Sequence, residues 1–180
     1  ATYLLSKKAE ELIFVHADNQ PFTDGREIEN FIKLTKHLKK HISCPITVYS
    51  VPHGDALSSY KIYCENRFTC VFCKRMLLRY AEKIAEKEKA DAIIMGDSLG
   101  QVASQTLQNI RVVEQAVRIP ILRPLIGFDK EDVIKIAKEI GTYDLSILPS
   151  DGCSAFLKKQ ATQAKLHQIL TEEKKTNIKK

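Results

Sequence analysis

The chain has 180 residues and a formal net charge of +6, and 44% of its residues are hydrophobic. This length suits one domain with a single core, and this apolar content is near the average of globular proteins and argues against a disordered chain. No apolar run reaches the roughly 18 residues that cross a bilayer, and the first residues do not form a secretory leader, so we expect neither a membrane protein nor a secreted one. The basic excess suits a polyanion such as RNA, although an ordinary solvated surface is the simpler explanation.

From the N-terminus onward, apolar spacing and turn residues predict an alternation of helices and strands. In chain order these are helix Thr2–Lys8, strand Glu11–Ala17, helix Gly25–His41, strand Ile46–Val51, helices Asp55–Asn66 and Val71–Lys87, strand Ala92–Met95, helix Val102–Val117, strand Ile121–Leu125, a helix capped by Asp129 and ended by Gly141, and helix Ala155–Leu170. We assign residues 1–170 to one domain and residues 171–180 to a charged tail. The alternation predicts an α/β fold with a doubly wound parallel sheet.

Ligands of doubly wound sheets bind beyond the carboxyl ends of the strands. Four stretches occupy that position here, namely His16–Phe22, Val51–Asp55, Gly96–Gln105 and Leu125–Asp129. Since most of these stretches are rich in Gly, Asp, His or Gln, the predicted edge of the sheet is also the predicted binding site.

The most specific of these stretches is the turn after the third strand, GDSLGQVASQT, residues 96–106. Its glycines allow the backbone to approach a ligand closely, and the free amides at the start of the following helix favour an anion. Asp97 and Gln105 add side-chain acceptors and donors that suit a nucleobase, a ribose or a substrate. On glycine spacing alone, an ordinary strand-to-helix turn explains the pattern equally well.

Five cysteines without a leader peptide favour reactive or metal-binding thiols over disulfides. Cys70 and Cys73 stand three apart at a predicted helix start, followed by Lys74 and Arg75, so we expect lowered thiol pKa values. This pair suits a nucleophile, a persulfide carrier or half of a metal site. With Cys153 as a third ligand, an iron–sulfur cluster fits better than structural zinc.

The remaining thiols and the two candidate histidines have simpler explanations. Cys44 and Cys64 are expected to be inert, because nothing polar or reactive accompanies them in the sequence. His16 and His53 both follow or end predicted strands, where a lone histidine is more often structural than catalytic. The sequence contains no Ser/His/Asp or paired-carboxylate arrangement that would indicate a hydrolase.

Taken together, the turn at residues 96–106, the stretch ILRPLI at 121–126 and the stretch DKE at 129–131 resemble the 4-thiouridine synthetase (ThiI) family. The resemblance extends from Tyr3 to about Cys153. It implies an adenine nucleotide α-hydrolase-like fold of the pyrophosphatase-loop class. The family's first strand and its phosphate loop, SGGxDS, would lie just before Ala1, as would its RNA-binding modules, so we expect a catalytic-domain fragment that is inactive by itself.

The resemblance also implies roles for individual residues. His16 and Ala17 would flank the adenine or ribose of ATP, bound with Mg²⁺, and Lys74 would contact its phosphates. Gly96 and Gln105 would complete the nucleotide pocket, with Asp97 as a helper.

The reaction that the family implies is the adenylation of a tRNA uridine, followed by displacement of AMP by sulfur to give 4-thiouridine. A role in sulfur supply for the thiamine thiazole is implied as well. The paired cysteines and the absence of a rhodanese domain resemble the archaeal-type members. In these, Cys70, Cys73 and Cys153 would either bind an iron–sulfur cluster or relay sulfur, and both roles stay open. The expected partners are tRNA, a sulfur donor (a persulfide protein or sulfide) and a second copy in a homodimer, all in the cytoplasm.

Two other classes of function remain open on the sequence. One is another pyrophosphatase-loop enzyme, for tRNA 2-thiolation or amide formation. The other is a non-catalytic iron–sulfur or RNA-binding module.

Overall fold

We describe residues 1–155 and 159–176 of a computed structural model of the chain. The strands are β1 (Leu12–Asp18), β2 (Ile46–Pro52), β3 (Ile93–Ile94) and β4 (Ile121–Leu122). The α-helices are α1 (Thr2–Ser6), α2 (Arg26–Leu38), α3 (Gly54–Tyr63), α4 (Thr69–Glu88), α5 (Leu107–Glu114), α6 (Lys130–Glu139), α7 (Tyr143–Ser146) and α8 (Leu166–Glu173). Short 3₁₀ turns cover Lys39–His41, Asn66–Phe68 and Ala103–Gln105.

All strand pairs in the described residues are parallel, which confirms the predicted α/β class. Strand β1 pairs with β2 in a register that joins Leu12 to Ile46 and Asp18 to Pro52, and β3 pairs with β4. The hydrogen-bonded sheet is nevertheless divided into two ribbons of two strands each, where the sequence predicts one continuous sheet.

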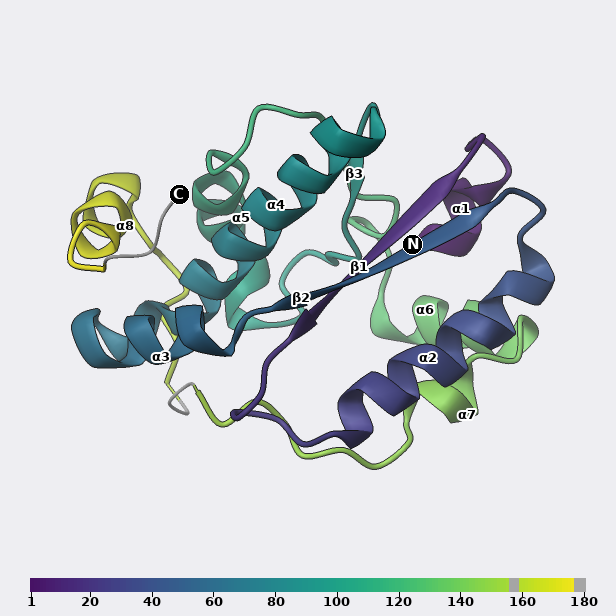
Figure 1. Ribbon diagram of the computed structural model, residues 1–180, viewed down its shortest axis with the longest axis horizontal. Coiled ribbons are helices and arrows are strands. Elements are labelled where there is room, and N and C mark those ends of the chain that lie inside the picture. Colours follow the sequence, from purple (N-terminus) through teal and green to yellow (C-terminus); the bar gives the residue numbers. More distant parts are fainter. Residues whose placement is uncertain (156–158, 177–180) are drawn as a thin grey trace.

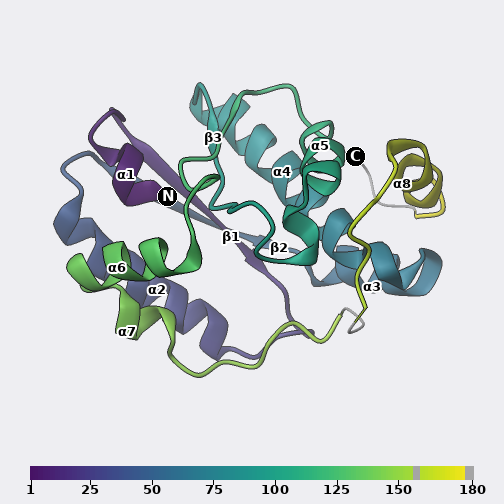
Figure 2. The same ribbon diagram turned by 180° about the vertical axis from the view of Figure 1, so that it is seen from behind.

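Helices cover both sides of the strands, as a doubly wound arrangement requires. Figure 1 shows α3, α4 and α5 on one side of β1 and β2, and α2, α6 and α7 on the other. The same two layers are seen from behind in Figure 2, where α8 lies at the end of the molecule beside α5. The predicted doubly wound arrangement, with helices on both faces of the strands, is therefore confirmed.

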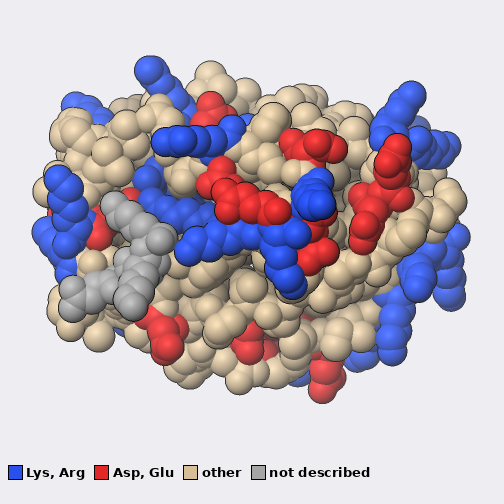
Figure 3. All heavy atoms as spheres, turned by 45° about the horizontal axis from the view of Figure 1, so that its top comes forward, with Lys and Arg blue, Asp and Glu red and all other residues tan. Residues whose placement is uncertain are grey.

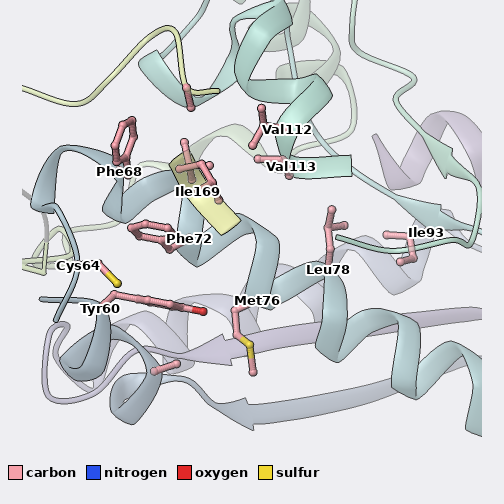
Figure 4. Packing of buried hydrophobic residues seen from close by; sticks show 13 residues of the cluster. Tyr60, Cys64, Phe68, Phe72, Met76, Leu78, Ile93, Val112, Val113 and Ile169 are labelled. Carbon is pink, nitrogen blue, oxygen red and sulfur yellow. The ribbon is translucent and has the colours of Figure 1, made fainter. Parts of the chain in front are cut away.

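The main hydrophobic core lies on the α4 side. Figure 4 shows side chains from α3, α4, α5 and α8 converging there, with the rings of Tyr60 and Phe72 stacked at 5.0 Å and that of Phe68 edge-on to Phe72 at 6.2 Å. By contrast, α2 and α6 contain no fully buried residue. Burial of large apolar side chains stabilises a fold by about 1.5–3 kcal/mol for each one, so the α4 layer contributes most of the stability.

A buried ion-pair network fastens α8 to this core. Glu173 accepts hydrogen bonds from the guanidinium of Arg75, at 2.8 and 3.2 Å, and from that of Arg79, at 3.0 and 2.8 Å. Arg75 also donates to the carbonyl oxygen of Val112 at 2.5 Å. Residues Thr171–Glu173, which we assigned to a solvated tail, thus belong to a packed helix; Asn177–Lys180 lie outside the described residues.

A cavity of about 790 Å³ separates the two ribbons. It is lined mainly by apolar side chains of β1, β3, α2 and α4, among them Phe14, Phe31, Leu78 and Ile93. In the described residues neither β1 nor β3 has a strand partner on the side that faces this cavity.

Helices α5 and α8 both begin later than predicted, because hydrogen bonds of the Asn109 side chain hold the residues before them in another conformation. Helix α5 begins only at Leu107, because Thr106 caps it and the side chain of Asn109 binds the carbonyl oxygen of Ala103 at 2.6 Å. Asn109 also binds the backbone of Ala161 and Ala164, which holds that segment out of the predicted helix Ala155–Leu170. Residues 156–158 of that prediction lie outside the described part. The short helix α7 was not predicted at all.

The cap of α6 agrees with the prediction. Asp129 precedes the helix, its backbone N–H donates to Asp132 at 3.3 Å, and Gly141 follows the helix with a φ of +68° that suits glycine. Among the described residues, no helix is long and apolar enough to cross a membrane.

Candidate active site

The candidate site is centred on the carboxylate of Asp97, in the turn that follows β3. Lys74 of α4 donates to it at 2.6 Å, and Arg123, directly after β4, donates through Nε at 3.2 Å. The side-chain amide of Gln105 adds a bond of 3.4 Å. Residues from α4, from the β3 turn and from the end of β4 therefore meet at one carboxyl-end edge, as predicted for Lys74, Asp97 and Gln105.

The electrostatics of this group favour an ionised carboxylate. Burial alone would raise the pKa of Asp97, but the hydrogen bond and charge of Lys74, with Arg123 and Gln105, hold this pKa below its ordinary value. Lys74 keeps 21% of its side chain exposed against 12% for Arg123, so it is the more accessible of the two cations.

Two polar atoms beside Asp97 are buried without a hydrogen-bond partner in the described residues. One is a donor, Nη2 of Arg123, and the other is an acceptor, Oε1 of Gln105. Buried polar groups of folded proteins are normally paired with protein, water or ligand. This site consequently has unused hydrogen-bonding capacity next to a fully engaged carboxylate.

The thiols lie close to the same edge. Cys70 and Cys73 occupy the first turns of α4, and the segment with Cys153 is fastened to the turn after β1, where Ser154 donates to the carbonyl oxygen of Phe22 at 2.9 Å. The three thiols are near enough to influence one another's ionisation. All five cysteines are free.

The expected lowering of the thiol pKa values is wrong. Burial raises the pKa of Cys70, and it raises that of Cys73 to about 12, where the neighbouring thiols of Cys153 and Cys70 add to the effect of burial. Lys74 lowers both pKa values, but by less than burial raises them, and Arg75 is paired with Glu173. The helix start is also occupied, since the N–H of Cys70 donates to the side-chain oxygen of Gln160 at 3.2 Å.

The predicted metal ligands are not arranged for a metal. Within residues 1–155 and 159–176, no group of three or more His, Cys, Asp or Glu side chains is placed to hold a metal ion. Cys70, Cys73 and Cys153 are therefore neighbours without forming a ligand set, and the residues do not fit an iron–sulfur cluster in this conformation.

His16 and Ala17 lie in the other ribbon of strands from the Asp97 group. Both belong to β1, and the ring of His16 stacks on Phe31 of α2 at 4.6 Å, on the face opposite α4. Gly96 lies directly before Asp97, and a side chain at this position would meet Ala1. The hydrogen bonds around Asp97 thus bring together Lys74 and Gln105, with Gly96 next to Asp97 in the chain.

The sequence does not predict two residues of the site, Arg123 and Gln160. Arg123 was missed because β4 was expected to run to Leu125, which put the edge of the sheet two residues too late; its early end at Leu122 exposes Arg123 to the site. Gln160, which caps α4, lies in a segment that was predicted to be helical, and no sequence signal would have found it.

The basic excess is not concentrated on the face shown in Figure 3. Lys and Arg side chains are interspersed there with Asp and Glu over much of the surface. Non-specific attraction of a polyanion to this face is accordingly modest.

Comparisons with known proteins agree with this fold and edge. The family described as "Thiamine biosynthesis protein (ThiI)" matches residues 1–178. A protein of Methanobrevibacter smithii named "Probable tRNA sulfurtransferase" is 42% identical over 170 residues, which are 94% of this chain and 45% of that protein. One of the same name from Methanothermobacter thermautotrophicus is 40% identical over 180 residues, covering 99% of this chain and 46% of that protein.

A solved structure has the same fold. It is a crystal structure of a 4-thiouridine synthetase–RNA complex with bound ATP, superposed with a TM-score of 0.85 at 33% identity over 90% of this chain and 43% of that chain. The chain thus spans about half the length of the relatives that it matches.

Proposed function

Because this chain belongs to the ThiI family, we propose that it is the catalytic core of an ATP-dependent tRNA sulfurtransferase that makes 4-thiouridine. The observation that carries the proposal is the meeting of Lys74, Asp97, Gln105 and Arg123 at one carboxyl-end edge, with three thiols beside it. Activation of a carbonyl by a nucleotide and attack by sulfur need these two kinds of group in one place.

ATP is proposed to bind at this edge. Lys74, the most exposed cation of the group, contacts the phosphates together with Mg²⁺, and Gly96 and Gln105 border the nucleotide. His16 and Ala17 are proposed to flank the adenine or ribose from the other ribbon. The solved relative binds ATP, which supports this assignment.

The cavity between β1 and β3 is proposed to hold one more parallel strand in the whole protein. Its apolar lining and its two unpaired edges match a strand buried on both faces. The loop after such a strand would bind the pyrophosphate of ATP.

The chemistry proceeds in two stages. The O4 oxygen of the uridine attacks the α-phosphate of ATP, pyrophosphate leaves, and the N3 proton is lost. The terminal sulfur of a cysteine persulfide then attacks C4 and displaces AMP. A second cysteine thiolate takes the inner sulfur as a disulfide and leaves the outer one on the base, so the reaction needs two thiols.

Cys70, Cys73 and Cys153 are proposed to supply these thiols. A persulfide protein would transfer its outer sulfur to a reduced thiol of this set after a thiol reductant has reduced the disulfide of the previous turnover. Sulfide would instead open that disulfide and leave one persulfide and one thiol. Since the three residues do not form a metal ligand set, the proposal contains no step on a cluster. The same persulfide would serve thiamine thiazole synthesis. ATP, tRNA and reduced thiols occur together in the cytoplasm, which is the proposed location.

The test is Cys73→Ala in the full-length protein. We expect 4-thiouridine formation to be abolished while tRNA-dependent release of pyrophosphate continues, because activation of the base precedes sulfur transfer. Both products are measured with purified tRNA and a sulfide or persulfide donor.

Cys44→Ala is the matched control and should retain both activities. Unchanged tRNA thiolation in Cys73→Ala would refute the role of Cys73. Loss of pyrophosphate release along with thiolation would refute a role confined to sulfur transfer.

A further inference from the structure

We infer that Arg26 positions Cys153 for the exchange of sulfur with the thiols of α4. It does so through an ion-pair cluster with Asp24 and Asp151, called here the Arg26 cluster, which holds the loop of residues 147–155 in place. The inference rests on the proposed function, because it concerns the thiols that are proposed to carry sulfur. The three charged residues are positioning residues, since they act through Cys153 and not on a reacting atom.

The loop that carries Cys153 has no regular structure of its own. Residues 147–155 form neither helix nor strand. In the described residues, the hydrogen bonds and the ion pair that join residues 149–154 to other elements all run to residues 22–30. Figures 1 and 2 both show the loop running alongside the chain between β1 and α2. Because no ladder of backbone bonds fixes an irregular loop, these contacts determine where the thiol lies.

The contacts anchor the loop on both sides of Cys153. Two residues before the thiol, Oδ1 of Asp151 pairs with Nη2 of Arg26 at 3.0 Å. One residue after it, Ser154 donates to the carbonyl oxygen of Phe22 from its N–H at 2.9 Å and from its hydroxyl at 3.0 Å. The thiol is therefore held between a charged anchor and a neutral one.

The charged anchor consists of three mutually bonded groups. Nε of Arg26 donates to Oδ2 of Asp24 at 2.5 Å, and the same oxygen accepts from the backbone N–H of Asp151 at 3.4 Å. The hydrogen bond from Arg26 holds the pKa of Asp24 below its ordinary value, so the cluster is fully charged at neutral pH. Asp151 is consequently bound twice, by a guanidinium and by the carboxylate next to it.

The turn that receives the loop is itself fixed beside the thiols of α4. Glu27 accepts from Oγ1 of Thr23 at 2.6 Å and from Nδ2 of Asn19 at 3.3 Å, which ties the turn to the start of α2. Burial comes first among the causes that raise the pKa of Cys73, followed by the neighbouring thiols, Cys153 foremost, and by the carboxylate of Glu27. The turn and the loop bound to it thus both lie close to Cys73.

The Arg26 cluster is suited to placement more than to stability. The side chains of Arg26 and Asp151 are 51% and 76% exposed, and exposed ion pairs contribute little to the free energy of unfolding. A disulfide, by contrast, forms only when the two Cα atoms come within roughly 7 Å of each other. Exchange between Cys153 and the thiols of α4 therefore depends on the position of the loop, even where stability does not.

The experiment equilibrates the full-length protein with glutathione buffers, without ATP or tRNA. One oxidised glutathione takes two electrons and two protons from the thiols of Cys153 and of Cys70 or Cys73; one protein disulfide and two reduced glutathiones result. Peptide mass spectrometry gives the equilibrium constant of the Cys153 disulfide. We expect Arg26→Gln and Asp151→Asn each to lower it about three- to fivefold, as for one exposed ion pair, with an unchanged urea midpoint.

Two further readouts separate placement from a general effect. The difference between each variant and the wild-type protein should disappear at about 1 M salt, where exposed ion pairs are screened. The matched control is Glu29→Gln, which breaks an exposed ion pair with Lys33 on the same helix, and it should keep the wild-type equilibrium constant.

A wild-type equilibrium constant in both Arg26→Gln and Asp151→Asn would overturn the inference, as would the absence of any Cys153 disulfide in the wild-type protein. A lower constant that is accompanied by a lower urea midpoint would also overturn it, because the Arg26 cluster would then be structural. If the full-length protein makes no 4-thiouridine but the two variants still shift the constant, the proposed function fails and the positioning role of Arg26 stands.

Discussion

Two buried carboxylates are each held by two cations in this protein, and the two groups differ in what they leave open. Glu173 is enclosed by Arg75 and Arg79, and its group is almost fully buried, with Arg75 only 1% exposed. Asp97 is held by Lys74 and Arg123, of which Lys74 is accessible and Arg123 has a spare N–H. The two groups start from adjacent residues of α4, Lys74 and Arg75, yet join α4 to different elements, the turn after β3 and helix α8.

The difference separates a structural role from a functional one. In both groups burial alone would raise the carboxylate pKa, and the neighbouring cations hold it below its ordinary value. Ion pairing and a shifted pKa are therefore the same in both, and neither marks a site. The distinguishing property is a pair of buried polar atoms, on Arg123 and Gln105, that lack a hydrogen-bond partner in the described residues, together with the 21% exposure of Lys74. The described residues of the Glu173 group have no such unpaired atom.

The largest expected effect concerns the enclosed group around Glu173. Glu173→Gln should lower the free energy of unfolding by about 3–5 kcal/mol, because two buried guanidiniums lose their counter-charge. Urea denaturation of the chain measures it. The matched control is Glu65→Gln, which breaks an ion pair with Arg67 on the surface and should change stability by less than about 1 kcal/mol. A similar small change in Glu173→Gln would mean that this group does not hold α8 in place.

His53, a buried residue whose ring nitrogens have no hydrogen-bond partner in the described residues, extends the comparison to a third buried ionisable group. His53 is fully buried, no hydrogen bond to its ring nitrogens occurs in the part of the chain described, and burial lowers its pKa to about 4. Since the folded-state pKa is below the ordinary value near 6.5, the unfolded chain takes up the proton first as the pH falls. The stability is thus complete above about pH 6.5 and is lost progressively toward pH 4.

We expect this loss to approach about 3 kcal/mol, since each pKa unit corresponds to about 1.4 kcal/mol. Denaturation of the chain between pH 7 and pH 4 measures it. His53→Asn should flatten the dependence, and the same change at exposed His41 should not. An equal slope in His53→Asn and in the wild-type chain would show that other groups control the acid response.

The smallest expected effect concerns the group around Asp97. Lys74→Ala should raise the dissociation constant of ATP about tenfold, or about 1.4 kcal/mol, because the accessible cation of the site is lost. Calorimetry on the full-length protein measures it, with Lys83→Ala, an exposed lysine on the same helix, as control. If ATP affinity is unaltered in Lys74→Ala, the Asp97 group does not bind the nucleotide.

Much of the fold could be predicted because it depends on local patterns. The apolar spacing of β1, α2 and α4 and the cap at Asp129 specify their elements from within their own segments. The boundaries that failed depend on distant contacts instead. Asn109 holds the backbone of residues 103 and 161–164 through its side chain, and no local pattern reveals such an arrangement.

The same limit applies to the site. Asp97 and Gln105 could be predicted because ligands of parallel sheets bind beyond the carboxyl ends of the strands, and both residues follow a recognisable strand. The ionisation of Cys73 could not be predicted, since it depends on where its neighbours in the sequence point. Lys74 lowers its pKa, but burial and the neighbouring thiols raise it by more, and Arg75 is paired with Glu173 from another part of the chain.

The cavity between β1 and β3 has a practical consequence for handling the chain. In the part of the chain that the structure describes, strand edges of β1 and β3 that have no strand partner border an apolar slot, and natural proteins usually cover or charge such edges to prevent self-association. In isolation the chain is expected to recruit extended segments of other molecules into the slot and to precipitate on concentration. Fusing residues that fill the slot should keep it monomeric.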